Sequence, residues 1–524
     1  MDMTNIMRTP DLILSSDEPS GRYAATISEN TVQAGYRGGK VWVRAPEGIS
    51  FLILRWHGDF SPKCRIFGDV FERSYGDLEW RCILPERIMP WYCAAYDGER
   101  CEGFGVKVRP NAFCYWQIDG YGVSLTLDLR CGAGPALLEE EICAAELVYD
   151  VSGERPYAFL QGFCLKMSDS PVLPKQPVYG SNSWYYCYSA SNRELIIKDA
   201  MLLQELTEGL ENRPFAVVDC GWSETTDPED PCAGTALADG NTAFGDMKTL
   251  ADEVKGYGVR PGIWLRPLCL SCGKTVSEDL VLRRVNPGQY PCLDPSIPEA
   301  LEIVGEDIRK AVDAWGYELI KIDFSTFDLL GKFHDHGELN CMGGGWSFKN
   351  KNKTSAQIIK DFYACIAQNA KDAVIIGCNC IGHLSSGYFH IYRIGDDTSG
   401  KVFERTRKMG VNTLAYRICQ HKAFYDIDAD CIGQAGDMPW ELNKQWLELL
   451  AYSGTPLFVS IHPDRVTQEQ KDTLRASYRA AARQDDVLEP LDFTDTACPD
   501  RYLINGREKT FKWFSDTGVT DFYI

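Results

Sequence analysis

The sequence has 524 residues and a formal net charge of −20 at pH 7. This length allows two or three domains. The negative charge argues against a nucleic-acid partner, because phosphate contacts need clusters of Lys and Arg. No apolar run approaches the roughly eighteen residues of a membrane-spanning helix, and the N-terminus lacks the basic start and apolar stretch of a secretory signal. We therefore expect no membrane partner, and a neutral small-molecule substrate suits the charge.

The cysteine content predicts a reducing, cytoplasmic location. There are 21 cysteines, an odd number spread over a long chain, whereas small secreted scaffolds have dense and even sets. Most of the thiols are therefore expected to be buried packing groups. Cys269 and Cys272 have CxxC spacing but no second pair, so packing is favoured over a zinc site. Cys378 and Cys380 are interpreted in the same way.

Residues 1–170 are predicted to form a β-sandwich. Short alternating stretches rich in β-branched and aromatic residues occur at 40–43, 51–54 and 123–129. Turn signals such as the Asp-Gly pair at 97–98 separate them, and long helical periods are few. Several short strands with frequent turns favour two packed antiparallel sheets.

Residues 171–484 are predicted to form an α/β domain, a (β/α)₈ TIM barrel, followed by a short β-rich segment at 485–524. Eight apolar strands alternate with helix-length amphipathic segments, and about 310 residues suit such a barrel. The expected strands are 180–186, 215–220, 262–265, 319–324, 374–378, 391–394, 413–416 and 456–460. The expected helices include 193–206, 246–257, 298–315, 355–370 and 441–452. The C-terminal segment has strand-like pieces at 502–504 and 510–514.

A loop at 331–353 follows the fourth expected strand. It is long and rich in glycine, which is typical of a functional lid. His334 and His336 within it could be imagined as metal ligands, but no HExxH motif accompanies them, and a solvated pair is the favoured interpretation.

Polar and aromatic side chains end most of the expected strands. Active sites of such barrels gather at the carboxyl ends of the strands, so these side chains are expected to share one rim. Aromatic faces stack on the C–H faces of sugars, and charged groups bond strongly to hydroxyls, so the set points to glycosides. The residues are Asn182, Trp184, Asp219, Cys220, Trp264, Arg266, Lys321, Asp323, Cys378, Asn379, Arg393, Asp396 and Asp397.

The carboxylates within this set suit two different tasks. Lys321 and Asp323 are two residues apart on a strand and point to the same side, where the lysine would keep the aspartate ionised as a nucleophile requires. A buried ion pair that fixes the barrel is the competing interpretation. Asp396 and Asp397 are adjacent, so one is expected to face the substrate. A partly apolar setting would raise the pKa of that aspartate and suit it to act as an acid.

Several segments along the barrel resemble motifs of glycoside hydrolase family 36, the clan D α-galactosidases. They occur in the family's order and cover the whole barrel. The segments are GSNSWYYCY from 180, AFGDMKTLADEVKGYGVRPGIWL from 243, CLDPSIPEA from 292, LIKIDF from 319, the Gly-Cys pair at 377–378 with RIGDDTSG from 393, and DIDADC from 426.

The resemblance implies a retaining, exo-acting α-glycoside hydrolase with an N-terminal β-sandwich and no cofactor or metal. Asp323 matches the nucleophile, which forms a covalent glycosyl-enzyme, and Asp397 matches the acid/base residue. Retention of configuration places such carboxylates roughly 5–5.5 Å apart. Further residues match positions that line the first sugar subsite: Trp184, Trp264, Lys321, Cys378 and Arg393. The expected partner is an α-linked oligosaccharide or glycoside.

One residue departs from the family pattern. Asp219 matches the first of two consecutive aspartates that read galactose hydroxyls, but Cys220 stands where the second is usual. Loss of a charged hydrogen bond to a hydroxyl costs about 1.5–3 kcal/mol. A modified sugar such as N-acetylgalactosamine or galactosamine is therefore an alternative to galactose, unless a neighbouring group or a different pose compensates.

The N-terminal domain is also expected to reach the site. In the related enzymes a loop of this domain lies at the barrel mouth, and ERSYGDLEW at 72–80 is the matching candidate. Tyr75 or Trp80 would then help to close the subsite, with plain packing as the alternative for Trp80.

Three other functions compete with that of a retaining α-glycoside hydrolase. A transglycosylase would share the chemistry and differ in its acceptor. A non-catalytic sugar-binding protein would share the fold, although both Asp323 and Asp397 are present. A metal-dependent hydrolase would use His334 and His336 and lose activity to a chelator.

Overall fold

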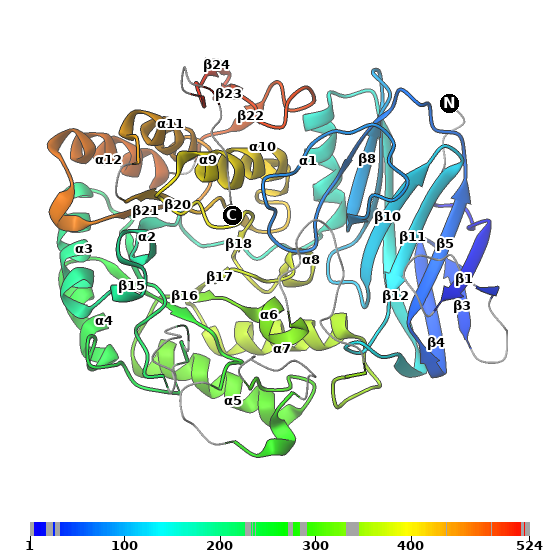
Figure 1. Ribbon diagram of the computed structural model, residues 1–524, viewed down its shortest axis with the longest axis horizontal. Coiled ribbons are helices and arrows are strands. Elements are labelled where there is room, and N and C mark those ends of the chain that lie inside the picture. Colours follow the sequence, from blue (N-terminus) through cyan, green and yellow to red (C-terminus); the bar gives the residue numbers. More distant parts are fainter. Residues whose placement is uncertain are drawn as a thin grey trace.

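The computed structural model describes residues 5–16, 25–26, 32–225, 232, 234–235, 237–270, 276–282, 291–331, 345–435, 438–483, 485–514 and 518. A β-sandwich forms one end of the molecule and a barrel the other (Figure 1). The fold is an α/β (β/α)₈ TIM barrel with an N-terminal β-sandwich and a short C-terminal β segment, as the sequence predicts.

The sandwich consists of two six-stranded sheets. One has the order β2 (Ala25–Thr26), β1 (Leu12–Ser16), β5 (Phe51–His57), β11 (Gly122–Asp128), β10 (Phe113–Asp119), β7 (Met89–Pro90). The other has the order β3 (Gln33–Arg37), β4 (Lys40–Ile49), β12 (Ala136–Ser152), β9 (Cys101–Val106), β8 (Tyr92–Tyr96), β6 (Arg65–Gly68). Trp56 and Phe104 pack against Trp116, with ring centroids 6.4 and 6.0 Å from it. Inward-facing aromatic residues thus fill the core between the sheets.

A helix that the sequence did not predict joins the two halves. Helix α1 (Pro156–Met167) contacts β9 and β12 of the sandwich on one side and the helical turn η5 (Ile418–Gln420) of the barrel on the other. A Cβ at Gly103 would meet the rings of Phe159 and Phe163 at about 3.0 Å. Glycine in β9 therefore lets α1 lie close against the sheet.

The barrel strands are all parallel and largely buried. Their order is β19 (Asp426–Asp428), β18 (Ile391–Arg393), β17 (Val374–Gly377), β16 (Leu319–Ile322), β15 (Arg260–Leu265), β14 (Phe215–Val218), β13 (Tyr179–Asn182), β21 (Leu457–Ile461), β20 (Cys431–Gln434). The two edge strands, β19 and β20, are separated in the chain by two residues, so the edges meet and the sheet closes. Strands buried on both faces appear in sequence as short apolar runs, which is why most of them were predictable.

Helices cover the outside of the barrel. The long ones are α3 (Arg193–Leu206), α4 (Met247–Gly256), α5 (Pro298–Arg309) continued by η3 (Lys310–Ala314), α7 (Ser355–Ala370), α11 (Trp440–Ala451) and α12 (Gln468–Ala481). The short ones are α2 (Trp184–Cys187), η1 (Tyr188–Ala190), η2 (Glu278–Leu280), α6 (Ser325–Leu330), α8 (Gly382–Ser385), α9 (Phe403–Thr406), η4 (Arg407–Asn412), α10 (Thr413–Arg417) and η6 (Pro463–Arg465). Side chains cap the first turns of α3, α4, α7 and α12, and Thr354 forms a capping box with Gln357.

The seventh barrel strand lies later than predicted. Residues 413–416 form most of helix α10, within a continuous helical stretch from α9 to η5. A run of four residues cannot distinguish a strand from one turn of a buried helix. The strand itself is split into β19 and β20, and its polar sequence, Asp426 and Asp428 included, hides it from a search for apolar runs.

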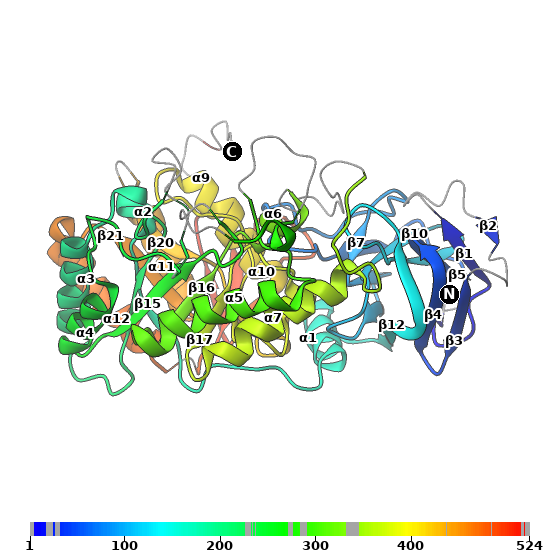
Figure 2. The same ribbon diagram turned by 90° about the horizontal axis from the view of Figure 1, so that it is seen from below.

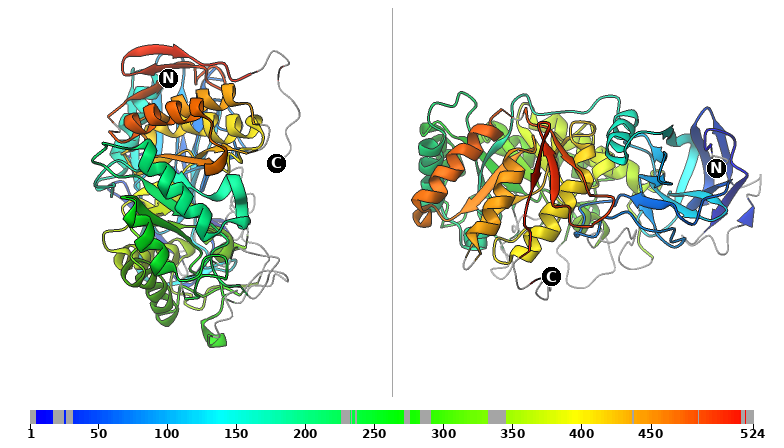
Figure 3. Two further views of the ribbon diagram at one scale, coloured as in Figure 1. Left: turned by 90° about the vertical axis from the view of Figure 1, so that its left-hand side faces the viewer. Right: turned by 90° about the horizontal axis from the view of Figure 1, so that it is seen from above.

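The C-terminal segment forms a three-stranded antiparallel sheet of β22 (Leu488–Pro490), β23 (Arg501–Ile504) and β24 (Arg507–Thr510). The last strand ends at Thr510, so the strand expected at 510–514 lies too late. The sheet rests against the barrel helices (Figure 3, red), where Gln445 of α11 exchanges hydrogen bonds with the backbone of Lys512. Every helix within the described residues is too short or too polar to cross a membrane.

Candidate functional site

The carboxyl ends of the barrel strands all open on one side. Figure 2 shows α2, α6 and α9, which follow β13, β16 and β18, on the upper side of the barrel. Asp219 comes directly after β14, Asp323 directly after β16, and Asp397 four residues after the last residue of β18. The rim predicted from the sequence is therefore the face on which these side chains gather.

Asp323 is buried and is held by uncharged N–H donors. The indole Nε1 of Trp264 donates to Oδ2 at 2.9 Å, and the backbone N–H of Phe324 donates to Oδ1 at 2.6 Å. The Nδ2 group of Asn379 also donates to Oδ1. These donors fix both oxygens of the carboxylate and stabilise its negative charge without neutralising it.

The charge partner of Lys321 is Asp219 rather than Asp323. The ammonium Nζ lies 2.8 Å from Oδ2 of Asp219, and Asn182 donates to the same oxygen at 2.6 Å. Burial lowers the pKa of Lys321, but the Asp219 carboxylate and neighbouring groups outweigh it and hold the pKa well above its usual value. The competing interpretation, an ion pair with Asp323, is thus wrong in its partner, whereas the charge of Lys321 does act on Asp323, as expected from the shared face.

Cys220 is not a thiol but half of a disulfide. It is bonded to Cys232, twelve residues further on. The other 17 cysteines of the described residues are mostly buried, as expected. The disulfide places sulfur rather than a carboxylate beside Asp219. It also fastens the segment after β14 to the rim.

This fastened segment supports Trp264. A Cβ at Gly234 would lie 1.8 Å from the indole ring, so only glycine permits the segment to pass so closely. The backbone N–H of Arg266 donates to the carbonyl of Gly234 at 2.7 Å, and its guanidinium donates to the carbonyl of Cys232 at 3.1 Å. Arg266 is itself paired with buried Asp328 at 2.7 Å. Arg266 therefore holds the segment around Gly234 in place beside Trp264.

Arg393 connects two carboxylates, one four residues later in its own segment and one just after the neighbouring strand β19. Its Nη2 lies 2.7 Å from Oδ2 of Asp430 and 3.0 Å from Oδ1 of Asp397. Asp430 also accepts hydrogen bonds from the hydroxyl of Tyr185 and from the backbone N–H of Thr398, the latter at 2.8 Å. Asp430 thereby ties the split seventh strand to the segment that carries Asp397.

The two adjacent aspartates have different surroundings. Asp396 is 5% exposed and is paired with Arg73, at 2.9 Å, and with Arg405. The side chain of Asp397 is 37% exposed. Burial raises the pKa of Asp397, but Arg393, Arg73 and further cations outweigh it and lower the pKa to about 2. The expected apolar setting with a raised pKa is wrong, because cations ring this carboxylate.

The N-terminal domain reaches the rim through a segment that we call the strap, residues 69–80. Its residue Tyr75 lies beside Arg73, whose guanidinium carbon is 5.6 Å from the ring centroid. Trp80 is 7% exposed and packs against Phe67 and Phe493, with ring centroids 5.6 and 6.1 Å away. Trp80 therefore has a packing role, as the competing interpretation proposed.

Other sequence candidates lie at different depths. Trp184 is partly exposed at the rim, whereas Cys378 is 1% exposed. Trp222 belongs to the core, where its ring meets that of Trp315 at 5.6 Å. Most of the expected lid, with His334 and His336, and also Cys272, lie outside the described residues. Of the lid, 345–353 is anchored to the sandwich, since the N–H of Leu137 donates to the carbonyl of Lys351 at 2.8 Å.

Within the described residues, no three His, Cys, Asp or Glu side chains gather in a way that would hold a metal ion. The acidic groups of the rim are instead engaged by Lys, Arg and uncharged donors.

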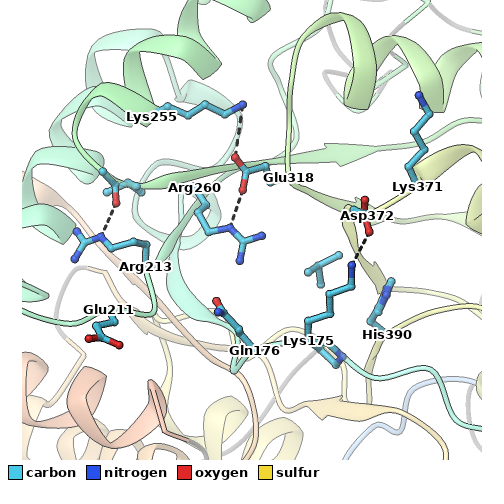
Figure 4. A pocket seen from close by; sticks show the side chains of 14 residues that line it. Lys175, Gln176, Glu211, Arg213, Lys255, Arg260, Glu318, Lys371, Asp372 and His390 are labelled. Atoms are coloured by element: carbon cyan, nitrogen blue, oxygen red, sulfur yellow. Dashed lines mark hydrogen bonds and ion pairs between the residues drawn. The ribbon is translucent and has the colours of Figure 1, made fainter.

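A cavity of about 570 Å³ opens at the opposite end of the barrel (Figure 4). It is lined by five basic side chains, Lys175, Arg213, Lys255, Arg260 and Lys371, and three acidic ones, Glu211, Glu318 and Asp372. Three of the basic groups lie at or just beyond the carboxyl ends of α3, α4 and α7, where a positive charge complements the helix dipole. This end of a (β/α)₈ barrel usually contributes to stability, whereas active sites lie at the carboxyl end. We therefore do not place the functional site here.

Among the rim residues that were not singled out from the sequence are Arg73, Asp430 and Tyr185. Each lies inside a motif that was recognised in the sequence, so the position was visible and the role was not. Their contacts bridge strands or domains that are far apart in sequence, which no local pattern reports.

No protein-family model and no curated protein matches the chain. Solved structures do. An α-galactosidase from Thermus thermophilus in complex with p-nitrophenyl α-D-galactopyranoside matches with a TM-score of 0.60 at 16% identity, over 92% of this chain and 99% of that one. A glycoside hydrolase family 36 α-galactosidase from Geobacillus stearothermophilus matches with a TM-score of 0.56 at 14% identity, over 87% and 68%. An α-galactosidase from Lactobacillus brevis matches with a TM-score of 0.58 at 12% identity, over 90% and 68%.

The fold is therefore that of a barrel with an N-terminal sandwich, shared with glycoside hydrolase family 36 α-galactosidases. The resemblance seen in the sequence is confirmed at the level of fold.

Proposed function

We propose that the chain is a retaining, exo-acting α-glycoside hydrolase of the α-galactosidase type. The observation that carries the proposal is the pair of unlike carboxylates on one rim. Asp323 is fixed by uncharged N–H donors, and Asp397 is ringed by cations. Two carboxylates with different environments are what a double displacement needs.

In the first step, Asp323 is the nucleophile. One of its oxygens attacks the anomeric carbon, the glycosidic C–O bond breaks, and Asp397 delivers a proton to the departing oxygen. The product is a glycosyl-aspartate on Asp323 and a free aglycone. The low pKa of Asp397 makes this protonation difficult at neutral pH, so we expect activity to fall as pH rises and to be greatest at acid pH.

In the second step, Asp397 acts as a base. It removes a proton from a water molecule, whose oxygen attacks the anomeric carbon and releases Asp323. The sugar leaves with its original anomeric configuration. Because Asp397 gave up its proton in the first step, it is ionised and ready for this task.

The remaining rim residues bind the sugar in this proposal. Trp184 and Trp264 offer aromatic faces, and the linked groups Asp219 and Lys321 address hydroxyls. Arg393 and Cys378 complete the subsite. Because Cys220 is bonded to Cys232, it supplies neither a carboxylate nor a thiol, and an axial hydroxyl would lack its usual partner. This favours a modified sugar, such as N-acetylgalactosamine or galactosamine, as the alternative to galactose.

We propose the divisions 1–170 for the sandwich domain, 171–484 for the catalytic barrel and 485–524 for the C-terminal segment. We also propose a cytoplasmic location, which the many free cysteines support and which the Cys220–Cys232 disulfide opposes.

A panel of aryl α-glycosides tests the function: galactoside, N-acetylgalactosaminide, galactosaminide, glucoside and arabinopyranoside. We expect turnover of at least one, with retention of configuration by NMR, and no effect of a chelator. Excess acceptor sugar in the same assay separates hydrolysis from transglycosylation by its products. No turnover of any member would contradict the proposal and favour a sugar-binding role.

A further inference from the structure

The strap of the N-terminal domain is joined to the barrel at the segment that carries Asp397. The backbone N–H of Ser74 donates to the carbonyl of Ile394 at 2.8 Å, and the N–H of Asp396 donates to the carbonyl of Ser74 at 2.9 Å. These two bonds make a parallel bridge between Ser74 and Gly395. One residue of the sandwich domain therefore pairs with the chain just beyond β18, as a neighbouring strand would.

The strap is fixed on both sides of this bridge. Before it, Asp69 is paired with buried Arg417 of α10 at 2.8 Å. After it, Asn412 of η4 donates to the carbonyl of Leu78 at 2.8 Å and accepts from its N–H at 3.2 Å. The bridge is thus held in a single register, and the side chain before Ser74 has a defined place.

That side chain is Arg73, which the strap inserts between the two adjacent aspartates. The Nη1 group is 2.9 Å from Oδ1 of Asp396 and 3.9 Å from Oδ1 of Asp397. Arg405 holds the other oxygen of Asp396 and donates to the backbone carbonyl of Asp397 at 2.6 Å. Asp396 therefore neutralises much of the positive charge of the two arginines. The Oδ1 atom of Asp397 lies next to Arg393.

We propose that Arg73 is a positioning residue for Asp397, through which the N-terminal sandwich domain governs the acid/base step of the barrel. The inference rests on the proposed function in assigning that step to Asp397. Arg73 acts in two ways. It locks Asp396, and hence the main chain of its neighbour, and it brings a positive charge to the carboxylate from outside the barrel.

The charge of Arg73 is one of several that Asp397 meets. The other charged or titratable groups facing it are Arg393 of β18, Lys321 of β16, Arg405 of α9, its neighbour Asp396, Asp430 between β19 and β20, Tyr185 of α2 and Tyr188 of η1. All except Arg73 belong to the barrel. Substitution of Arg73 therefore removes the contribution of the sandwich and leaves the others in place.

The direction of the effect follows from the sign of the charge. A nearby cation favours the ionised carboxylate, so loss of Arg73 makes Asp397 easier to protonate and raises its pKa. The first step needs protonated Asp397, so the decline of kcat/KM with rising pH moves to higher pH. An opposite charge at this range shifts a pKa by about one unit or more.

The test compares Arg73→Met with Arg73→Lys, using the aryl α-glycoside that the wild-type chain hydrolyses fastest. We expect the basic limb of kcat/KM to lie about one pH unit higher in Arg73→Met. Arg73→Lys, which retains the charge, should remain near the wild type. Asp69→Asn is the matched control, because it weakens the strap without altering a group that faces Asp397. A limb that stays in place in Arg73→Met, or that moves equally in Asp69→Asn, would overturn the proposal.

A second measurement is independent of turnover. Carboxyl ¹³C NMR of aspartate-labelled protein, with Asp397 assigned from Asp397→Asn, follows the ionisation of this group directly. We expect Asp397 to protonate at higher pH in Arg73→Met than in the wild type, and equal titration would overturn the proposal. A wild-type chain without glycosidase activity would contradict the proposed function instead. If Arg73→Met does not fold, Arg73→Gln, which also removes the charge, replaces it in both measurements with the same expected shift.

Discussion

The two ends of the barrel both carry many charges, but the charges are arranged differently. At the carboxyl end, Asp219, Asp323 and Asp397 follow different strands, and the first two are buried and held by side chains of other strands. At the amino end, ion pairs also join distant segments, as Lys175 and Asp372 do, but these side chains are mostly exposed. Burial of the charges, rather than their density, distinguishes the candidate site.

The cavity at the amino end is therefore not the better candidate. The hollow of Figure 4 is flanked by ion pairs such as Lys175–Asp372 at 2.6 Å, in which both side chains are mostly exposed. Exposed pairs of this kind contribute little free energy and need no ligand to explain them. Most of the rim carboxylates are instead buried and engaged by several donors, an arrangement that costs stability and is better explained by a function.

The largest contrast is expected between Asp323→Asn and Glu318→Gln, at opposite ends of the same strand. Asp323→Asn removes the proposed nucleophile and should lower kcat by on the order of a thousandfold or more. Asparagine keeps the size of the side chain and can still accept a hydrogen bond from Trp264. We therefore expect circular dichroism and thermal unfolding to show a folded protein.

Glu318→Gln is the control at the amino end. Glu318 is paired with Arg260 at 2.8 Å and with Lys255 at 3.6 Å, and it is partly exposed. Its loss should change the free energy of unfolding by about 1 kcal/mol or less and leave kcat/KM unchanged. Unchanged turnover in Asp323→Asn, or equal losses in both variants, would remove the distinction between the two ends.

Removal of the Cys220–Cys232 disulfide tests how strongly the rim depends on this crosslink. The disulfide closes a loop of twelve residues, and removal of such a crosslink costs about 3 kcal/mol in the chain-entropy account. We expect the double variant Cys220→Ser, Cys232→Ser, or treatment with reductant, to lower the melting temperature by a few degrees. The fall in kcat/KM should be larger than the stability change alone explains, because Gly234 supports Trp264 and Trp264 holds Asp323.

Cys143→Ser serves as the control for this prediction, since Cys143 is a partly exposed free cysteine of the sandwich. Cys143→Ser should change neither the melting temperature nor kcat/KM. The double variant should no longer respond to reductant. Wild-type protein that keeps its melting temperature and its kcat/KM under reducing conditions would show that the crosslink is not what supports the rim.

The sequence predicted those parts of the molecule that depend on local patterns. The helices α3 and α7 begin and end where expected, because a capping residue and an apolar stripe mark them. The rim followed from one rule, that barrel sites lie where strands end. Strand β19 was missed because its sequence is polar. Asp426 and Asp428 interrupt the apolar run that would reveal a buried strand.

Contacts between side chains of different strands were harder to predict than the positions of the residues in the fold. The spacing of Lys321 and Asp323 correctly gave a shared face, but the partner of Lys321 is Asp219, 102 residues away. The pKa of Asp397 was assigned the wrong direction for the same reason. Its setting was expected to be partly apolar, whereas the cations that surround it come from β16, β18, α9 and the strap. A local pattern cannot report a field that is assembled by the fold.

No effect on activity is expected at Arg213, at the amino end of the barrel. Its guanidinium donates to two carbonyls beyond the carboxyl end of α3 and to one beyond the carboxyl end of α4, so Arg213→Met should lower the free energy of unfolding by about 1–3 kcal/mol. The kcat/KM of the aryl glycoside should not change, because none of these contacts extends to the rim. Inorganic phosphate, titrated while the melting temperature is followed, should give no saturable stabilisation in either protein. Saturable stabilisation that is lost in Arg213→Met would instead make the cavity of Figure 4 an anion site, and the two ends of the barrel would then both bind ligands.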